Sequence, residues 1–128
     1  PWAPSKLYEQ AFSISQREAM NERMKELGRS SFWMPPEDAT PEQLAEYEAF
    51  MARATVAEEK ITTRIDVSAQ LDQKWAAIGR HVTQISMESP FMLMGLEGWR
   101  EFWATESYVL RESRIPASAP ETDLFAGL

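Results

Sequence analysis

The residues best placed to do chemistry lie near the middle of the chain, around its single histidine, His81. An imidazole can gain or lose a proton near neutral pH, so this residue could serve as a general acid or base. Lys74, Ala77, His81 and Gln84 are spaced by three, four and three positions, which on a helix places them along one edge. Such a row could line a polar cleft. It also fits a histidine at the core margin that hydrogen-bonds to backbone, and the pattern alone leaves both open.

The sequence offers little for a metal site of its own. One histidine and no cysteine cannot form a His- or Cys-rich zinc site. The acids Glu58, Glu59, Asp66 and Asp72 are spread along the chain, whereas oxygen-ligand sites need several carboxylates that converge. We therefore predict that no metal site is made wholly within this chain.

Arg64 is a second polar candidate. It lies in a segment expected to be extended, where its planar guanidinium could bind a carboxylate or phosphate. A surface pair with a nearby acid is the simpler alternative. The sequence has no glycine-rich phosphate loop and no nucleophile elbow.

Two adjoining segments must position these side chains. Alternation of β-branched and polar residues from Ile61 to Val67 predicts a strand. A helix should follow, because one apolar stripe continues at helical spacing until Ser89-Pro90 ends it. The residues of that stripe are Leu71, Trp75, Ile78, Val82 and Ile85.

The remaining elements alternate between strand and helix, so the predicted fold class is α/β. Strands are expected over 6–13 and 108–115, and a short helix or loop rich in aromatic and Met residues over 91–103. A helix over 15–27 should begin with a capping box at Ser15 and end at Gly28. A helix over 40–54 should have Thr40 as N-cap, Pro41 at its first position and Gln43 at N3.

Composition excludes several classes of function. The chain has 128 residues, which suits one domain or part of one, and a net charge of −7. This charge argues against binding to nucleic acid or to an anionic membrane surface. There is no apolar run long enough for a membrane span and no leader pattern. With no cysteine, we expect a cytoplasmic protein.

Three segments carry a resemblance to a known family. They are the opening Pro1–Tyr8, the word His81-Val82-Thr83-Gln84, and the ending Glu121–Leu128. In this order and at these separations they resemble the C-terminal half of the PIG-L/LmbE-type zinc amidases, in particular the mycothiol S-conjugate amidase branch. The family's His-Pro-Asp-Asp-Glu metal box is absent from the sequence. The resemblance implies that residues 1–128 are the C-terminal portion of a Rossmann-like α/β deacetylase fold, with few strands, flanking helices and no metal-binding half.

The resemblance also implies a function. The complete protein would be a zinc-dependent amidase or deacetylase that hydrolyses the amide of mycothiol S-conjugates or related N-acyl glucosamines. Zinc ligands and the general base would lie on the N-terminal half, as part of the same protein or a separate chain, and this chain alone would be inactive. It would supply the wall of the substrate pocket.

Residue roles follow from the family's His-x-Ser/Thr-Gln word, which His81, Thr83 and Gln84 match. Gln84 would hold a catalytic tyrosine or a substrate oxygen, and His81 would orient a loop or contact the sugar. Neither would be a metal ligand. Lys74, Thr83 and Arg64 are expected to contact substrate. The chain departs from the family at Arg80, where relatives usually have Ala, and also at positions 9 and 86.

A second hypothesis belongs to a different class of function. A half of this fold that has lost catalysis could serve as a binding or assembly subunit, with the Met- and Trp-rich segment 91–103 as the interface. Homo-oligomers are compatible with either hypothesis. A second polypeptide carrying the metal box would distinguish them.

Overall fold

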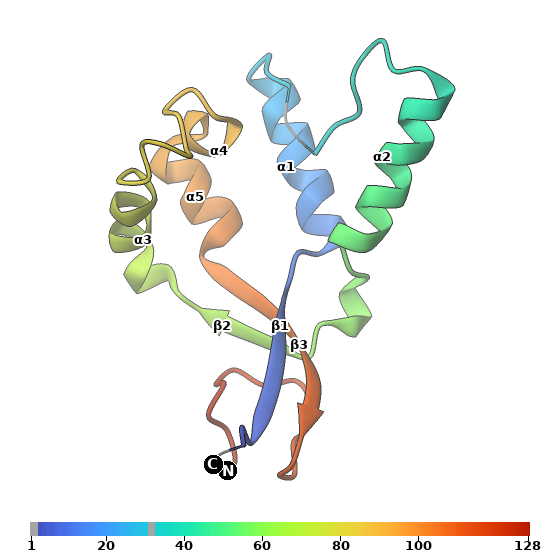
Figure 1. Cartoon of the computed structure of the whole chain (residues 1–128). Helices are drawn as coiled ribbons and strands as arrows, with labels where there is room; N and C mark the ends of the chain where they lie inside the picture. The colour runs from blue at the N-terminus through green and yellow to red at the C-terminus, as the bar shows by residue number, and fades with distance from the viewer. Residues whose placement is uncertain (1–2, 31–32) are drawn as a thin grey trace.

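The computed structural model describes residues 3–30 and 33–128, apart from the side chains at positions 90 and 91. Its sheet has three antiparallel strands in the order β1-β3-β2. Two groups of helices rise from one end of this sheet, while the start of β1 and the C-terminus lie at the other end (Figure 1). The strands are β1 (Lys6–Ala11), β2 (Thr63–Asp66) and β3 (Thr105–Ser113). The α-helices are α1 (Ile14–Glu26), α2 (Pro41–Ala54), α3 (Leu71–Ile78), α4 (Pro90–Leu93) and α5 (Gly95–Trp103), with single 3-10 turns at η1 (Glu58–Lys60) and η2 (Ser68–Gln70).

The middle strand, β3, lies near the C-terminus of the sequence and pairs with both other strands. Its residues pair with β1 from Lys6↔Ser113 to Ala11↔Ser107 and with β2 from Thr63↔Tyr108 to Asp66↔Thr105. The α/β class is therefore confirmed, with a small sheet. A Rossmann-like sheet is built from parallel strands, and the strands described here are antiparallel.

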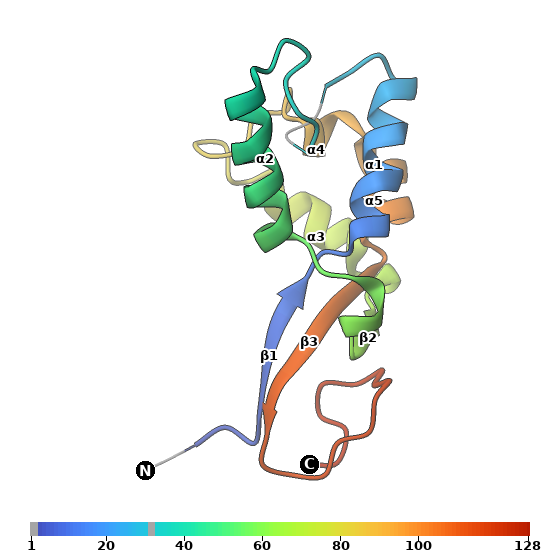
Figure 2. The same ribbon diagram turned by 90° about the vertical axis from the view of Figure 1, so that its right-hand side faces the viewer.

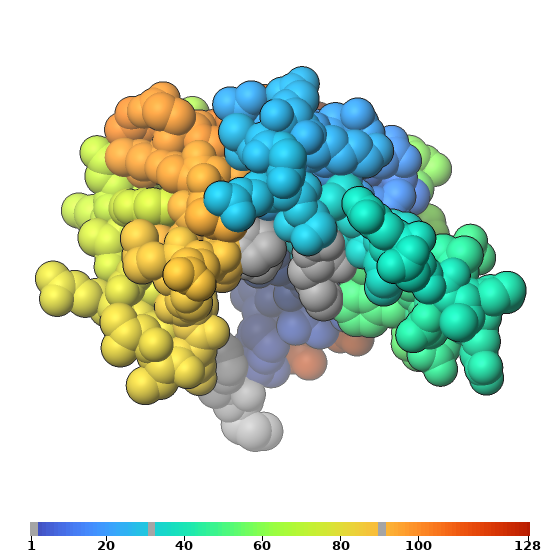
Figure 3. Space-filling view, turned by 90° about the horizontal axis from the view of Figure 1, so that it is seen from above, coloured from blue at the N-terminus to red at the C-terminus, as the bar shows by residue number. Residues whose placement is uncertain are grey.

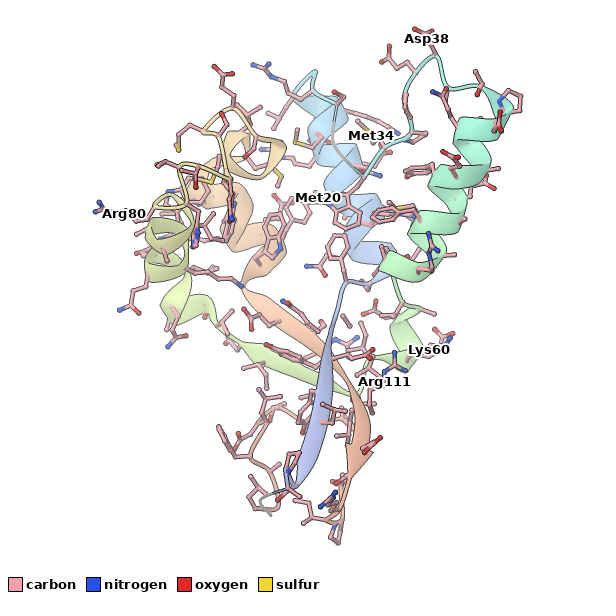
Figure 4. The ribbon with its side chains drawn as sticks, in the orientation of Figure 1. Met20, Met34, Asp38, Lys60, Arg80 and Arg111 are labelled. Carbon is pink, nitrogen blue, oxygen red and sulfur yellow. The ribbon has the colours of Figure 1, made fainter. Side chains whose placement is uncertain are left out.

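The core lies between the two groups of helices. Met20 and Met24 of α1 are buried with Met94 and Phe102, and the labelled Met20 points from α1 toward α5 (Figure 4). Three aromatic residues pack on this cluster: Phe12, Trp33 and Trp103. The expectation that residues 91–103 form a packed aromatic segment is confirmed by α5, where Trp99 is also buried. The rotated view shows α1 and α2 side by side above the sheet (Figure 2).

The ends of α1 and α2 test the capping predictions. Thr40 caps α2. Its hydroxyl accepts a hydrogen bond from the backbone amide of Gln43 at 3.3 Å, and its own backbone amide donates to the Gln43 side-chain oxygen at 2.9 Å. Gly28 follows α1 with φ of +64°, and the N–H groups of Gly28 and Arg29 close on the last carbonyls of the helix. Both predictions are confirmed.

The predicted capping box at Ser15 is wrong, because Ser13 caps α1 through a 3.0 Å bond from the Gln16 amide. A parallel bridge between Ser13 and Val56 keeps the chain extended up to Ser13, so the helix begins directly after it. The Ser15 hydroxyl donates to Glu58 instead.

The predicted long helix through Ile85 is also wrong, because α3 ends at Ile78. The backbone continues in turns closed by bonds from the His81 amide to Ile78 O and from the Gln84 and Ile85 amides to His81 O. Gly79 and the β-branched Val82 and Thr83 are poor helix formers. Val82 is 76% exposed, so no packing compensates for that weakness and the apolar stripe stops at Ile78.

A buried polar cluster fastens the C-terminal tail to β1. Lys6 and Glu121, whose side chains are only 3% and 4% exposed, form an ion pair at 2.6 Å. The Tyr8 and Thr63 hydroxyls donate to the other Glu121 oxygen at 2.7 and 3.1 Å. Lys6 also donates to the carbonyl of Ala126 at 2.7 Å. The opening and ending segments of the sequence are thus held together by one carboxylate.

The ionisation of this cluster is coupled to its structure. The hydrogen bonds from Lys6 and then Tyr8 lower the pKa of Glu121, and the hydrogen bond to Glu121 raises the pKa of Lys6. Desolvation and the bond to Glu121 raise the pKa of Tyr8. A lowered carboxyl pKa stabilises the fold at all pH values above the ordinary glutamate value, and this stabilisation is lost as the pH falls through the lowered value.

We therefore predict that acid releases the tail locally. The Arg64 amide donates to Glu121 O, and the Glu121 amide donates to Thr62 O, both at 2.9 Å. Hydrogen exchange of these two amides, corrected for the intrinsic pH dependence, should lose protection below about pH 4.5, the ordinary glutamate pKa. In the Glu121→Gln variant, the same two amides should be poorly protected from exchange already at neutral pH. Protection that is unchanged in the variant would contradict this account.

Candidate functional site

The predicted site residues separate into three places. His81, Thr83 and Gln84 lie together in the exposed turns that follow α3. Lys74 lies on α3 and faces the sheet, while Arg64 lies on β2. Because α3 ends before His81, Lys74 does not share one helix edge with His81 and Gln84. The structure keeps the three residues of the His-x-Thr-Gln word together and separates Lys74 and Arg64 from them.

The turn after α3 is an exposed mixture of polar and apolar side chains. Val82 and Met87 are 76% and 63% exposed, and they flank the exposed polar residues of the word. Seen from above, this loop lies at the margin of the molecule (Figure 3). These side chains are therefore available to a ligand or to another protein surface.

Lys74 belongs to a hydrogen-bonded triad between α3 and β3. Its ammonium donates to Glu106 Oε1, and the Tyr108 hydroxyl donates to Glu106 Oε2 at 2.5 Å. The hydrogen bond from Lys74 and then that from Tyr108 lower the pKa of Glu106. Burial, followed by the bond to Glu106, raises the pKa of Tyr108 to about 12. At neutral pH Glu106 is therefore a carboxylate and Tyr108 a neutral phenol.

Sequence reasoning missed Glu106 and Tyr108. The last strand was expected to begin at Tyr108, whereas β3 begins at Thr105. On a strand, Glu106 and Tyr108 share a face because side chains alternate. That alternation could have identified the pair, but the strand was predicted to start at Tyr108, which left Glu106 outside it.

Arg64 forms a surface ion pair with Glu58 at 2.6 Å. Glu58 also accepts from the Ser15 hydroxyl at 2.9 Å, and the bonds from Ser15 and then Arg64 lower its pKa. This is the surface pairing that the sequence left open as an alternative. To bind a ligand, the Arg64 guanidinium would first have to give up its ion pair with Glu58.

A hollow of about 260 Å³ opens where β1 ends, α1 begins and α5 passes into β3. Glu106 of the triad is part of its lining. A wider depression lies between α1 and the loop that leads to α2, among residues 18–44.

The described residues of this chain do not fit a zinc site. In the described ranges, no three side chains among His, Cys, Asp and Glu come together in a way that could hold a metal ion. None of the helices in these ranges has the length and apolar character that crossing a membrane would need.

Comparison with known proteins finds relatives over the whole length of this chain. A mycothiol S-conjugate amidase of Streptomyces coelicolor is 31% identical over 121 residues, which cover 94% of this chain and 38% of that protein. A 1D-myo-inositol 2-acetamido-2-deoxy-alpha-D-glucopyranoside deacetylase of Frankia alni is 34% identical over 131 residues, covering all of this chain and 42% of its own length. A deacetylase of the same name from Acidothermus cellulolyticus is 41% identical over 73 residues, covering 56% and 25%.

No family model matches the sequence, and no solved structure matches it. The relatives that align with almost all of the chain are themselves much longer, so the chain spans about two fifths of their length. The chain is therefore a homologue of the actinobacterial mycothiol S-conjugate amidases and inositol acetamido-glucopyranoside deacetylases, the PIG-L family, and corresponds to a part of those proteins.

Proposed function

We propose that the chain works as the substrate-pocket part of a cytoplasmic amidase or deacetylase. The reaction would be hydrolysis of the amide of a mycothiol S-conjugate or of a related N-acyl glucosamine. The observation that carries this proposal is the match of nearly the whole chain to relatives named for such reactions. The rest of the enzyme would be contributed by a further segment of the same protein or by a separate chain.

The exposed turn after α3 is the face that we assign to the pocket. The Gln84 amide can donate and accept hydrogen bonds at once, so it can hold a substrate oxygen or brace a catalytic hydroxyl. The His81 imidazole can donate or accept a hydrogen bond, and the Thr83 hydroxyl can bind a sugar hydroxyl. The exposed Val82 and Met87 would be buried against the rest of the enzyme, because large apolar side chains gain free energy on leaving water.

Lys74 and Arg64 take different parts in this proposal. Both are engaged, with Glu106 and Glu58 respectively. Lys74 ties α3 to the sheet, and so it positions the turn that carries His81 and Gln84. Arg64 could reach a substrate only by exchanging Glu58 for it.

Zinc would have to be held outside the described part of this chain, because the described residues do not assemble a ligand set. A bound zinc would polarise the carbonyl and activate a water. The contribution of this chain would be to orient the substrate and to exclude solvent from it. The assembly-subunit hypothesis had placed its interface at 91–103, but Met92, Trp99 and Phe102 of that segment are buried within the chain. That hypothesis therefore also has to use the exposed turn, and it gives these side chains no part in turnover.

Gln84→Ala in the complete enzyme should lower turnover by about 10–100-fold and leave zinc content and thermal stability nearly unchanged. This is the loss expected when one oriented supporting hydrogen bond is removed. Gln73→Ala is the matched control, since Gln73 is an exposed glutamine on α3. Steady-state kinetics, zinc analysis and thermal melts measure the outcome. Full activity in both Gln84→Ala and His81→Ala would remove this turn from the active site and favour the assembly subunit.

We predict that zinc is bound by the rest of the enzyme and not by this chain. The isolated 128-residue chain is expected to retain no stoichiometric zinc after dialysis at neutral pH, because its lone histidine and separated acids offer no ligand set. The complete enzyme is expected to retain it. Intact mass and metal analysis of both preparations test this, and a zinc-loaded isolated chain would contradict it.

The isolated chain should also expose the surface that we assign to the interface. We expect it to bind an apolar dye and to lack a cooperative thermal transition, because exposed apolar patches mark missing partners. Val82→Ser with Met87→Ser should reduce the dye signal, whereas Leu7→Ser at the far end of the sheet should not. A monomeric chain that melts cooperatively and binds no dye would contradict this prediction.

A further inference from the structure

The outer edge of β1 is a surface that the described part of the chain leaves open. The sheet order β1-β3-β2 places β1 at one border of the sheet and β2 at the other. In Figure 2, β1 borders the ribbon below α2, and no helix or strand lies beyond it. An edge strand presents a row of backbone N–H and C=O groups that can pair with a further strand. The free side of β1 is therefore a place where another extended segment could bind.

Two hydrogen bonds of β3 show which groups of β1 point outward. The carbonyl of Tyr108 accepts from the Thr62 amide at 3.0 Å, and the amide of Leu110 donates to the Thr62 hydroxyl at 2.7 Å. Both residues therefore direct these backbone groups toward β2. Their antiparallel partners on β1 are Gln10 and Tyr8, and in such pairs the backbone groups of the two residues point away from each other. Gln10 and Tyr8 thus turn their N–H and C=O groups to the outer side of β1.

The chain itself occupies this edge only beyond the end of β1. Val56 donates to the carbonyl of Phe12 and accepts from the amide of Ile14, both at 3.0 Å, which forms the parallel bridge between Ser13 and Val56. The open stretch therefore runs from Lys6 to Gln10. At about 3.4 Å per residue it is about 17 Å long, the usual length of a strand.

The opposite edge of the sheet is closed by the chain. The Arg64 amide donates to the carbonyl of Glu121, and the Glu121 amide donates to the carbonyl of Thr62, both at 2.9 Å, so the C-terminal tail covers β2. Common guards of an edge strand are proline and exposed lysine. The segment Lys6–Ala11 contains no proline, and Lys6 is bound to Glu121 with only 3% of its side chain exposed. Neither guard blocks the approach of a strand to β1.

A second copy of this chain is a poor occupant of the open edge. A symmetric antiparallel pair that used both outward-facing residues would set Tyr8 of each copy opposite Gln10 of the other. Glu9, which lies between them, would then be directly opposite its own counterpart. Like charges in this arrangement destabilise a pair of strands, and the net charge of −7 on each copy adds to the repulsion.

The rest of the enzyme is the occupant that homology supports. The chain matches its relatives over nearly its whole length but spans only about two fifths of them, so about three fifths of each relative lies outside the matched part. That length is ample to supply one more strand. Main-chain hydrogen bonds provide affinity when a strand is added to a sheet edge, and β1 is already extended, so little ordering is needed on its side.

We propose that the outer edge of β1, from Lys6 to Gln10, is the docking site for an extended strand from the rest of the enzyme. The added strand would enlarge the three-stranded sheet, with the backbone groups of Tyr8 and Gln10 as its hydrogen-bond partners. This inference rests on the proposed function only in taking the chain as part of a larger enzyme. It requires no zinc, no substrate and no role for Gln84.

Hydrogen exchange of the complete enzyme, followed residue by residue with NMR, tests this docking site. Glu9 is the internal reference, because its pair with Val109 is the one that exchanges hydrogen bonds with β3. We expect the Tyr8 and Gln10 amides to exchange within about tenfold of the Glu9 rate, whereas amides at an open edge exchange close to their intrinsic rates. Cross-strand amide NOEs from Tyr8 and Gln10 should lead to residues outside the 128 of this chain.

A pair of variants at one position isolates the backbone contribution. Gln10→Pro removes the outward N–H, and Gln10→Ala is the matched control that keeps it. In the complete enzyme, Gln10→Pro should speed exchange of the Tyr8 amide at least about tenfold, the effect of losing one hydrogen bond, and Gln10→Ala should stay within about twofold. At an open edge a proline is tolerated when its missing N–H would face solvent, so the two variants would then behave alike.

Several results would overturn the proposal. Near-intrinsic exchange at Tyr8 and Gln10 in the complete enzyme would show an open edge, as would equal exchange at Tyr8 in the two Gln10 variants. NOEs that lead back to residues of this chain would show a different cover. Protection that falls on about tenfold dilution would identify a second copy, because pairing between copies depends on concentration. Exchange is measured without substrate, so this test can succeed while the role of Gln84 in turnover fails, and the reverse.

Discussion

The pairing of β3 with strands from two distant parts of the chain is the constraint on which the rest of the structure depends. β1 and β2 both align on β3, and the tail that follows β3 returns to the same end of the sheet, where Glu121 meets Lys6. At the other end, β3 carries Glu106 to Lys74 of α3 and so fixes the helix from which the His81–Gln84 turn extends. One strand therefore sets the place of the tail, the triad and the turn.

Local sequence rules predicted much of the framework. Three local signals were sufficient to predict an element or its end, because each acts over a few neighbouring residues. They are Thr40-Pro41 at the start of α2, Gly28 after α1 and the alternation around Ile65. The Lys6–Glu121 and Lys74–Glu106 pairs were not predicted, since their partners are 115 and 32 positions apart. The end of α3 was misplaced for the opposite reason: the apolar spacing continues past Ile78, but Val82 has no surface to pack on within the described chain.

The candidate site likewise has a part that the sequence could predict and a part that it could not. The word His81-Val82-Thr83-Gln84 could be chosen from the sequence, because the resemblance rests on it and its residues stay together in space. The hollow beside Glu106 could not, because Gln10, Gln16, Trp103 and Ser107 come from four elements that only the folded chain brings together. The chain matches its relatives over nearly its whole length but spans only about two fifths of them, so the proposal places the rest of the active site outside these residues.

The central claim is that the turn after α3 faces the substrate of a larger amidase. A crystal structure of the complete enzyme with its amine product bound tests this most directly. The account predicts that the Gln84 side chain lies within about 3 Å, a hydrogen-bond distance, of the product or of a side chain that touches it, with Val82 and Met87 buried against the rest of the enzyme. A product bound far from a turn that remains in solvent would contradict it.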